Sequence, residues 1–382
     1  MTQPGRTNSY GPAEKKGADM PKESVFDDSS TRSMWKYLTS KDYRTAWTQH
    51  VIQLEEKRKE LQAFQKQAEI DEEEDIRLYF DRLRGAIRGF SNTRTSFTVL
   101  HPKGGIGKTP TICYVASVLG EISRRPIVLF EHHQMQGTAG DQLGLTGTVS
   151  LHSRKAAELF AAGMLNDSGS FTGDLPITKH GVMVVTSEEV VEEGELYGEE
   201  VSATNIQFAR KHAQFIANDT DNAIQIPATK GVLLNTDVII FPTSADEVTL
   251  RMTRRLRENL TRWGYGDLVT RSITVLSGVE PGDKLEDYRE KLGLSETDVL
   301  LTVPFDTRIF KRMPIDLDET DFYVQIAYRE IALAMLYASH AKSNPGFAEK
   351  LRMIRTGHLV DLPSGRTPVF PWIDGSDRRI AR

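Results

Sequence analysis

Cysteine is almost absent from this sequence: Cys113 is the single cysteine among 382 residues. One thiol forms no intrachain disulfide, and it excludes cysteine-based zinc sites and iron–sulfur clusters held by one chain. A run of about 18 apolar residues is also missing, so the sequence predicts no membrane-spanning helix. Residues 1–30 are polar and lack the apolar stretch of a signal peptide. We therefore expect a cytoplasmic protein.

The sequence also has no large excess of positive or negative charge. The chain has 48 basic and 53 acidic residues, a formal net charge of −5 and 39% hydrophobic residues. This mild acidity argues against a globally basic nucleic-acid binder, but it permits a local basic patch. The length predicts roughly two domains, or one large α/β domain with appendages. The modest hydrophobic content favours a polar tail or arm outside an ordinary core.

The two ends of the chain differ from its middle. Residues 1–30 are rich in Gly, Pro, Ser and charge, which is typical of a disordered tail. Residues 31–94 are predicted to form an N-terminal helical arm, because apolar residues such as Leu54 and Leu61 recur there at helical spacing. The pattern fits a solvated helical hairpin or arm, and it also fits an arm for self-association or partner binding. Residues 341–382 are expected to be a C-terminal extension.

Residues 95–340 alternate between strand and helix patterns. Helical stretches include residues 111–122, 204–212 and 248–263, and residues 188–200 are an acidic insertion expected to be a solvated loop. Such alternation predicts an α/β fold with a doubly wound, mostly parallel sheet. The expected strands are 96–100, 126–130, 182–185, 214–217, 238–241, 273–276 and 300–303.

A glycine-rich loop lies between the first expected strand and a helix. Residues 101–109 read HPKGGIGKT, which places the loop in the context that phosphate cradling requires. Glycines let the backbone N–H groups approach phosphates, and the helix N-terminus adds partial positive charge. Lys108 is suited to neutralise the β- and γ-phosphates, and Thr109 to ligate Mg²⁺. The usual first glycine of the motif is replaced by Pro102.

With this loop the sequence resembles the ParA/MinD family of P-loop ATPases, whose deviant Walker A motif has an extra lysine near its start. The resemblance covers about residues 95–339 and implies ATP and Mg²⁺ as cofactors. It also implies a homodimer that sandwiches ATP, in which Lys103 reaches the phosphates of the other subunit. A second lysine supplied in this way fits the charge of a triphosphate. The nucleotide-binding residues implied are Lys103, Gly104, Gly105, Ile106, Gly107, Lys108, Thr109 and Pro110.

The motif after the second expected strand departs from the family pattern. The family has D-x-D or D-x-N before a glycine, whereas Glu131 and His133 occupy the two acidic positions here. A histidine can orient water or accept a proton, since its pKa lies near neutrality. A slow ATPase with Lys103, Lys108, Glu131 and His133 as catalytic residues is one interpretation. A nucleotide-binding switch with little turnover is the other.

Two further segments resemble family motifs. Residues 215–221 read FIANDTD, an apolar strand ending in Asp-Thr, which assigns Asp219 to the Mg²⁺ site. Asp219 as a turn or helix-capping residue is the alternative. Residues 303–306 read VPFD and resemble the loop that closes over the adenine base. This resemblance implies nucleotide contacts at Pro304 and Asp306.

An arginine-rich helix is predicted over residues 250–263. Arginines on one helical face bind phosphate backbones without sequence preference. The alternative is a solvated face paired with Glu247 and Glu258. The resemblance favours DNA, because ParA dimers bind nonspecific DNA through basic patches at comparable positions. The expected DNA-binding residues are Arg251, Arg254, Arg255 and Arg262.

Together these features predict a ParA-like partition ATPase that serves DNA or plasmid segregation. An ATP-bound dimer would associate with the nucleoid, and hydrolysis stimulated by a ParB-like centromere-binding protein would release it. Membrane binding is not expected, because Pro371 and Gly375 interrupt the end of the chain where a MinD-type amphipathic helix would lie. The alternatives are a hydrolysis-impaired nucleotide-binding scaffold and a MinD-like positioning ATPase for secretion or envelope machinery.

Overall fold

The computed structural model describes residues 41–133, 137–145, 151–163, 175–187, 198–279, 283–306, 308 and 314–353. The expected tail (1–30), the acidic residues 188–197 and the chain end with Pro371 and Gly375 lie outside these ranges. None of the helices in the described ranges combines the length and the apolarity that crossing a bilayer requires.

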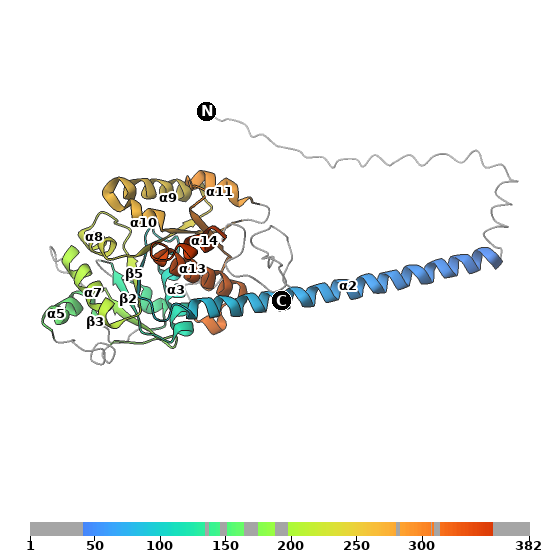
Figure 1. Ribbon diagram of the computed structural model, residues 1–382, viewed down its shortest axis with the longest axis horizontal. Coiled ribbons are helices and arrows are strands. Elements are labelled where there is room, and N and C mark those ends of the chain that lie inside the picture. The colour runs from blue at the N-terminus through green and yellow to red at the C-terminus, as the bar shows by residue number, and fades with distance from the viewer. Residues whose placement is uncertain are drawn as a thin grey trace, which may run out of the picture. The chain divides into compact units, whose positions relative to one another are not determined.

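The described residues form an eight-stranded sheet in which every pairing between strands is parallel (Figure 1). This confirms the predicted α/β class. The two-residue edge strand was not predicted, since it is too short to carry a pattern. In spatial order the strands are β3 (Leu151–His152), β4 (Val182–Thr186), β2 (Ile127–His132), β5 (Phe215–Thr220), β1 (Thr95–Val99), β6 (Val238–Ser244), β7 (Ile273–Ser277) and β8 (Val299–Val303).

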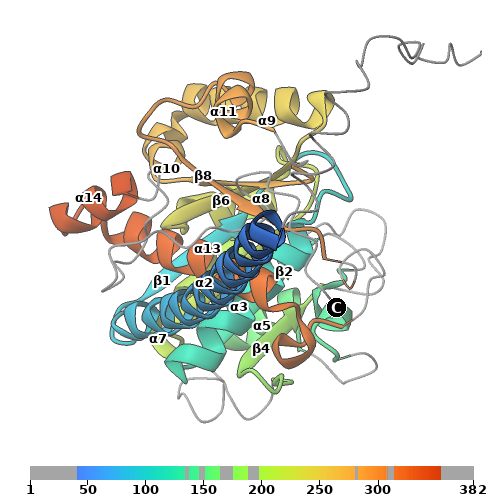
Figure 2. The same ribbon diagram turned by 90° about the vertical axis from the view of Figure 1, so that its right-hand side faces the viewer.

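Helices cover both faces of the sheet, which is why strands such as β2 and β6 begin as continuous apolar runs. In β2, Ile127 and Leu129 pack into one core cluster and Val128 and Phe130 into another. The first face carries α3 (Lys108–Ser123), α13 (Phe322–His340) and the C-terminal part of α2 (Lys41–Arg88) (Figure 2). The second face carries α5 (Ser153–Ala161), α7 (Glu199–His212), α8 (Pro227–Leu234), α9 (Glu247–Leu260), α10 (Gly266–Thr270) and α11 (Leu285–Leu292).

Helix α2 is one continuous helix of 48 residues rather than a hairpin. Its sequence has no proline and no glycine before Gly85, so nothing interrupts the backbone hydrogen bonds. The chain divides into two compact units between Ile70 and Asp71. In the second unit Tyr79 and Leu83 are fully buried in the core with α13, whereas Phe64 in the first unit is 72% exposed. The arm 31–94 as a separate domain stays a prediction.

The strand order positions the glycine-rich loop. β1 lies between β5 and β6, and β5 also pairs with β2. Because all these strands are parallel, the loops that follow β1, β2 and β5 meet at the carboxyl edge of the sheet. In open parallel sheets this edge is where ligands bind.

Candidate nucleotide-binding site

The glycine-rich loop joins the end of β1 to the start of α3. Gly105 and Gly107 have φ values of 75° and 89°, in the left-handed region that glycine adopts without strain. Gly107 is the N-cap residue of α3, so the first turn of the helix begins with Lys108 and Thr109. The loop therefore has the backbone freedom and the helix N-terminus that phosphate binding uses.

Lys108 is buried, with 6% of its surface exposed. Its Nζ donates to Asn222 Oδ1 and, at 3.4 Å, to Lys103 O. Burial lowers the pKa of Lys108, and the charges of Asp219 and Asp221 act in the opposite direction. The ammonium group thus lies at the loop beside two carboxylates, where an incoming phosphate would add a further anionic partner.

Asp219 lies near the end of β5, between the neighbouring strands β1 and β2. It is opposite Val99 in β1 and opposite Glu131 in β2. The side chain is fully buried, and neither carboxylate oxygen has a hydrogen-bond partner among the described residues. A buried carboxylate without hydrogen bonds costs free energy unless a cation or water shell compensates it. Its position beside the loop and α3 fits a Mg²⁺ ion and its coordinated water. Thr109, in the first turn of α3, as the second ligand stays a prediction.

His133 follows β2 and lies next to this carboxylate. Its Nε2 is 3.3 Å from Asp219 Oδ2, an ion pair without hydrogen-bond geometry. Burial lowers the pKa of His133, but the adjacent Asp219 carboxylate outweighs burial, so the pKa is raised overall. The structure thus brings together His133 and Asp219, which the sequence assigned to separate motifs.

Glu131 bridges two loops at the same edge. Its carboxylate accepts hydrogen bonds from the N–H groups of Ala139, Gly140 (3.1 Å) and Ser187 (3.0 Å). Burial raises the pKa of Glu131, and the hydrogen bond from Ser187 partly offsets this. These contacts fasten the segment after β2 to the end of β4. A catalytic role for Glu131 stays a prediction.

Lys103 contacts its own subunit through the start of α9. Its Nζ donates to Thr249 Oγ1 (2.6 Å) and lies 3.5 Å from Asp246 Oδ1. Asp246 is the N-cap of α9 and accepts from Thr249 N at 2.9 Å. The Lys103 side chain is 38% exposed. Its expected reach to another subunit requires leaving these partners.

The fold was compared with those of solved structures. A ParA family ATPase from Chlorobium tepidum has a TM-score of 0.53 and 14% identity, over 63% of this chain and 99% of that one. The fold is that of a ParA family ATPase. The septum site-determining protein MinD from Pyrococcus horikoshii, solved with Mg-ADP, has a TM-score of 0.49 and 17% identity, over 63% of this chain and 94% of that one. No protein-family model matches the sequence, and no curated protein matches it.

The ParA-type core also contains the expected adenine loop, which follows β8. Asp306 is buried, and its carboxylate accepts from Tyr114 Oη (2.6 Å) and Arg308 N (2.8 Å). These bonds attach the loop to α3. Between Pro304 and Asp306, Phe305 is 71% exposed, and the sequence analysis did not select it. Nucleotide contacts of Pro304 and Asp306 stay predictions.

The arginines predicted to bind DNA are all exposed on or just after α9 of the ParA-type core. Arg254 is paired with Glu258 at 3.1 Å, and Arg262 lies 3.9 Å from the same glutamate. Arg251 and Arg255 have no ion-pair or hydrogen-bond partner in the part of the chain that the structure describes. The predicted alternative was a face paired with Glu247 and Glu258. It describes only part of this surface, because Glu247 lies 3.7 Å from Lys291 instead.

Three residues of the site were missed by sequence reasoning: Asn222, Asp246 and Thr249. Asn222 also lies against the glycine-rich loop, since a Cβ on Gly104 would come within 3.3 Å of its Nδ2. A signal for it exists, because it follows Asp219 by three residues in the loop after β5. Asp246 begins the sequence DEVT, which is typical of a helix N-cap. Nothing local connects that cap to Lys103.

Proposed function

We propose that this chain is a ParA-type ATPase that binds ATP with Mg²⁺ in the loop between β1 and α3. The observation that carries this proposal is the buried Asp219 carboxylate, which has no hydrogen bond to the described residues and lies beside the glycine-rich loop. Mg²⁺, when bound, supplies charge neutralisation of the phosphates. Lys108 and the N–H groups at the start of α3 bind and orient the same phosphates.

The proposed active form is a homodimer that sandwiches ATP. Lys103 would leave Thr249 and Asp246 and contact the phosphates bound by the other subunit. Its partial exposure supports this proposal, because 38% of the side chain is accessible to solvent. One hydrogen bond to a neutral hydroxyl and one contact with an exposed carboxylate are modest compared with charge-assisted bonds to a triphosphate.

The proposed partner is nonspecific DNA, bound through the face of α9. Arg251 and Arg255 support it, because they have no carboxylate partner in the described residues. A surface pair such as Arg254–Glu258 contributes only about 0.3–0.5 kcal/mol, so a phosphate can replace the glutamate at small cost. A ParB-like protein that stimulates hydrolysis would release the dimer from DNA, which would serve DNA segregation on the nucleoid.

Slow hydrolysis is proposed because of His133. Its contact with Asp219 places an imidazole, rather than a carboxylate, beside the expected metal site. An imidazole can hold a water or accept its proton. The same contact favours a second candidate function, a nucleotide-binding switch with little turnover, because a protonated His133 would compete with Mg²⁺ for Asp219.

One experiment separates these functions. ATP hydrolysis and molar mass by light scattering would be measured with ATP, ADP and a nonhydrolysable analogue, with and without DNA. The proposed ATPase gives a dimer only with ATP or the analogue, and slow phosphate release. A dimer without phosphate release supports the switch, and absence of nucleotide binding overturns both. The exposed Lys211→Ala variant is a matched control for Lys108→Ala.

A further inference from the structure

A cavity of about 470 Å³ opens at the end of α3 that is remote from the glycine-rich loop. Its wall includes Gly120, Arg124 and Arg125 from the end of α3, and Ile177 and Met183 on either side of the turn before β4. Since α3 begins at Lys108, the cavity lies roughly 20 Å along the helix from the candidate nucleotide site. It has the volume of a small-ligand site.

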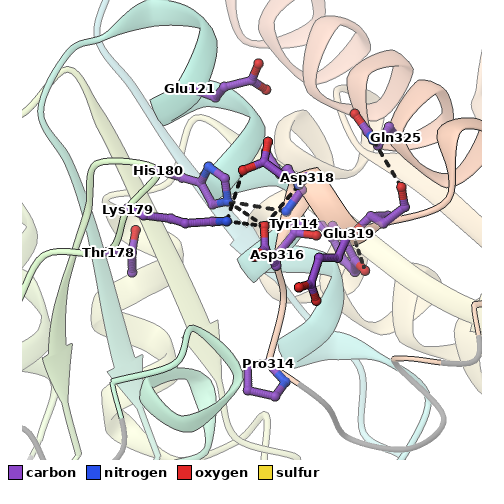
Figure 3. A network of polar contacts seen from close by, with 12 residues as sticks. Tyr114, Glu121, Thr178, Lys179, His180, Pro314, Asp316, Asp318, Glu319 and Gln325 are labelled. Atoms are coloured by element: carbon purple, nitrogen blue, oxygen red, sulfur yellow. Dashed lines mark hydrogen bonds and ion pairs between the residues drawn. The ribbon is translucent and has the colours of Figure 1, made fainter.

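The wall on the β4 side is held in place by close packing. A Cβ on Gly120 would lie 2.0 Å from the carbonyl oxygen of His180, so only glycine allows this approach. The next residue, Gly181, has a φ of 78°. His180 Nε2 accepts from Leu317 N at 3.3 Å, and Lys179 pairs with Asp318 at 3.0 Å (Figure 3). The turn is therefore attached to both α3 and the segment before α13.

Some charged residues around this cavity have ion-pair partners and others do not. Glu121 is paired with Arg329 at 2.6 Å and with Arg84 at 3.5 Å. Lys179 is likewise paired, with Asp316 and Asp318. Arg124 and Arg125, in contrast, are exposed and have no side-chain partner within the described ranges. Two guanidinium groups at the rim therefore have no carboxylate partner among the described residues.

Backbone strain also occurs at this rim. Arg124 has a φ of 52°, and it is the single non-glycine residue with a positive φ in the described ranges. A non-glycine residue in this region carries a cost that glycine avoids, and such residues are enriched at ligand sites. Glycine is the usual residue at this helix-terminal position. With arginine instead of glycine at position 124, the backbone is less favourable, but a guanidinium group is placed at the cavity.

The surroundings favour carboxylates over phosphates. The cavity adjoins the C-terminal carbonyl groups of α3, which carry partial negative charge, and Glu121. A dense multivalent anion would place all of its charge beside these carbonyl groups, whereas separate single charges can reach the arginines. Ile177 is 60% exposed, and Met183 and Pro126 add apolar surface to the lining. The matching ligand has carboxylates on either side of an aliphatic group.

We propose that this cavity is a docking site for an acidic polypeptide segment of a partner protein, with an aliphatic side chain seated between glutamates or aspartates. The aliphatic group would contact Ile177, and its acidic neighbours would pair with Arg124 and Arg125. This site is separate from the nucleotide loop and from the arginines of α9, so it does not depend on the proposed ATPase function.

The test uses the full chain without nucleotide and a fluorescent peptide, acetyl-Glu-Glu-Leu-Glu-Glu-amide, with binding followed by anisotropy. The peptide with Gln in place of each Glu, and the peptide with Gly in place of Leu, should each bind at least tenfold more weakly. The paired change Arg124→Gly and Arg125→Ala should weaken binding at least tenfold. Glycine at position 124 keeps the left-handed backbone, so this variant removes charge without adding strain.

The matched control is the pair Arg251→Ala and Arg255→Ala, which removes the same charge from another surface and should leave peptide binding within twofold. Equal losses in both double variants would overturn the proposal, because they would indicate a net-charge effect. More effective displacement by pyrophosphate than by unlabelled peptide would assign a phosphate site instead. Ile177→Ser, which keeps both arginines, should also weaken binding, and unchanged affinity there would contradict the apolar contact.

Discussion

His133 Nε2 lies 3.3 Å from Asp219 Oδ2, where β2 and β5 end side by side. An imidazole therefore faces the carboxylate that is expected to hold the magnesium shell, and this carboxylate raises the pKa of His133. Parallel pairing of the two strands produces this contact, since Glu131 is in register with Asp219 and His133 follows two residues later. The contact gives Asp219 an imidazole neighbour, and neither carboxylate oxygen has a hydrogen-bond partner within the described ranges.

Replacing Asp219 by Asn should abolish Mg²⁺ binding without lowering the stability of the metal-free chain. Without Mg²⁺ the unfolding temperature of the variant should change little, because the buried charge is removed together with its contact to His133. With ADP, the additional stabilisation that Mg²⁺ provides should be lost. Thermal unfolding with ADP, with and without Mg²⁺, measures both effects. A variant that keeps the full Mg²⁺-dependent shift would show that Asp219 is not at the metal site.

Lys108→Ala should weaken nucleotide binding at least about 100-fold, because the buried ammonium group is expected to be the phosphate-facing cation of the loop. Isothermal titration with ATP measures this loss. Lys211→Ala removes an exposed lysine at the end of α7 and should leave affinity unchanged. Unaltered ATP affinity in Lys108→Ala would contradict the assignment of the loop.

Lys103→Ala should leave ATP affinity within about threefold yet prevent the ATP-dependent dimer, because this lysine is expected to serve the other subunit's phosphates. Light scattering with ATP and ADP measures the molar mass. The loss of its bond to Thr249 should have little effect on folding, since Lys103 is partly exposed. A normal dimer would contradict the role between subunits.

His132 should contribute to loss of stability in acid. Burial lowers its pKa to about 4, and its Nε2 contacts Asn218 Oδ1 at 3.0 Å. Between pH 6.5 and 4 the unfolded chain binds a proton at this residue that the folded chain does not, so the free energy of unfolding falls as pH falls. His132→Gln should remove about 2 kcal/mol of the decrease between pH 7 and 5.

Urea denaturation at the two pH values measures that difference. Gln at position 132 keeps an N–H donor for Asn218, so it is a conservative replacement. His101, whose pKa burial also lowers to about 4, should account for part of the decrease that remains in the variant. An unchanged pH dependence in His132→Gln would show that this histidine is protonated in the folded protein.

Charge reversal of Arg251 and Arg255 to Glu should weaken DNA binding at least tenfold and leave ATP affinity unchanged. The slope of the logarithm of the DNA association constant against log salt concentration is negative. Its magnitude should fall by about 2, because each of the two arginines no longer neutralises a phosphate. Fluorescence anisotropy with duplexes of unrelated sequence measures both. The same reversal at Arg124 and Arg125 is the control, and an equal loss there would indicate an effect of net charge alone.

Most of the sheet was predictable from the sequence because its strands are buried on both faces. The seven predicted strands form the sheet interior and the β8 edge, and each is a short segment rich in apolar and β-branched residues. The glycine-rich loop was predictable for a similar reason, since its backbone needs are local to Gly105 and Gly107. The exception is α2. Apolar residues at helical spacing fit a helical hairpin and a continuous helix equally well.

The side-chain partners in the site were not predictable in this way. Lys103 and Thr249 are 146 residues apart, and Lys108 and Asn222 are 114 apart. Which residues meet at the carboxyl edge depends on the order of β2, β5, β1 and β6 across the sheet. The chain pattern indicates that strands alternate with helices, but it does not specify that order.

The amino-acid sequence by itself determined the α/β class, the phosphate-type loop and the arginine face of α9, because each depends on spacing between near neighbours. Only the tertiary structure decided that His133 faces Asp219, that Glu131 bridges two loops, and that Arg124 and Arg125 border a cavity. These relationships join residues from separate strands and helices. They exist only when packing of the sheet brings those elements together.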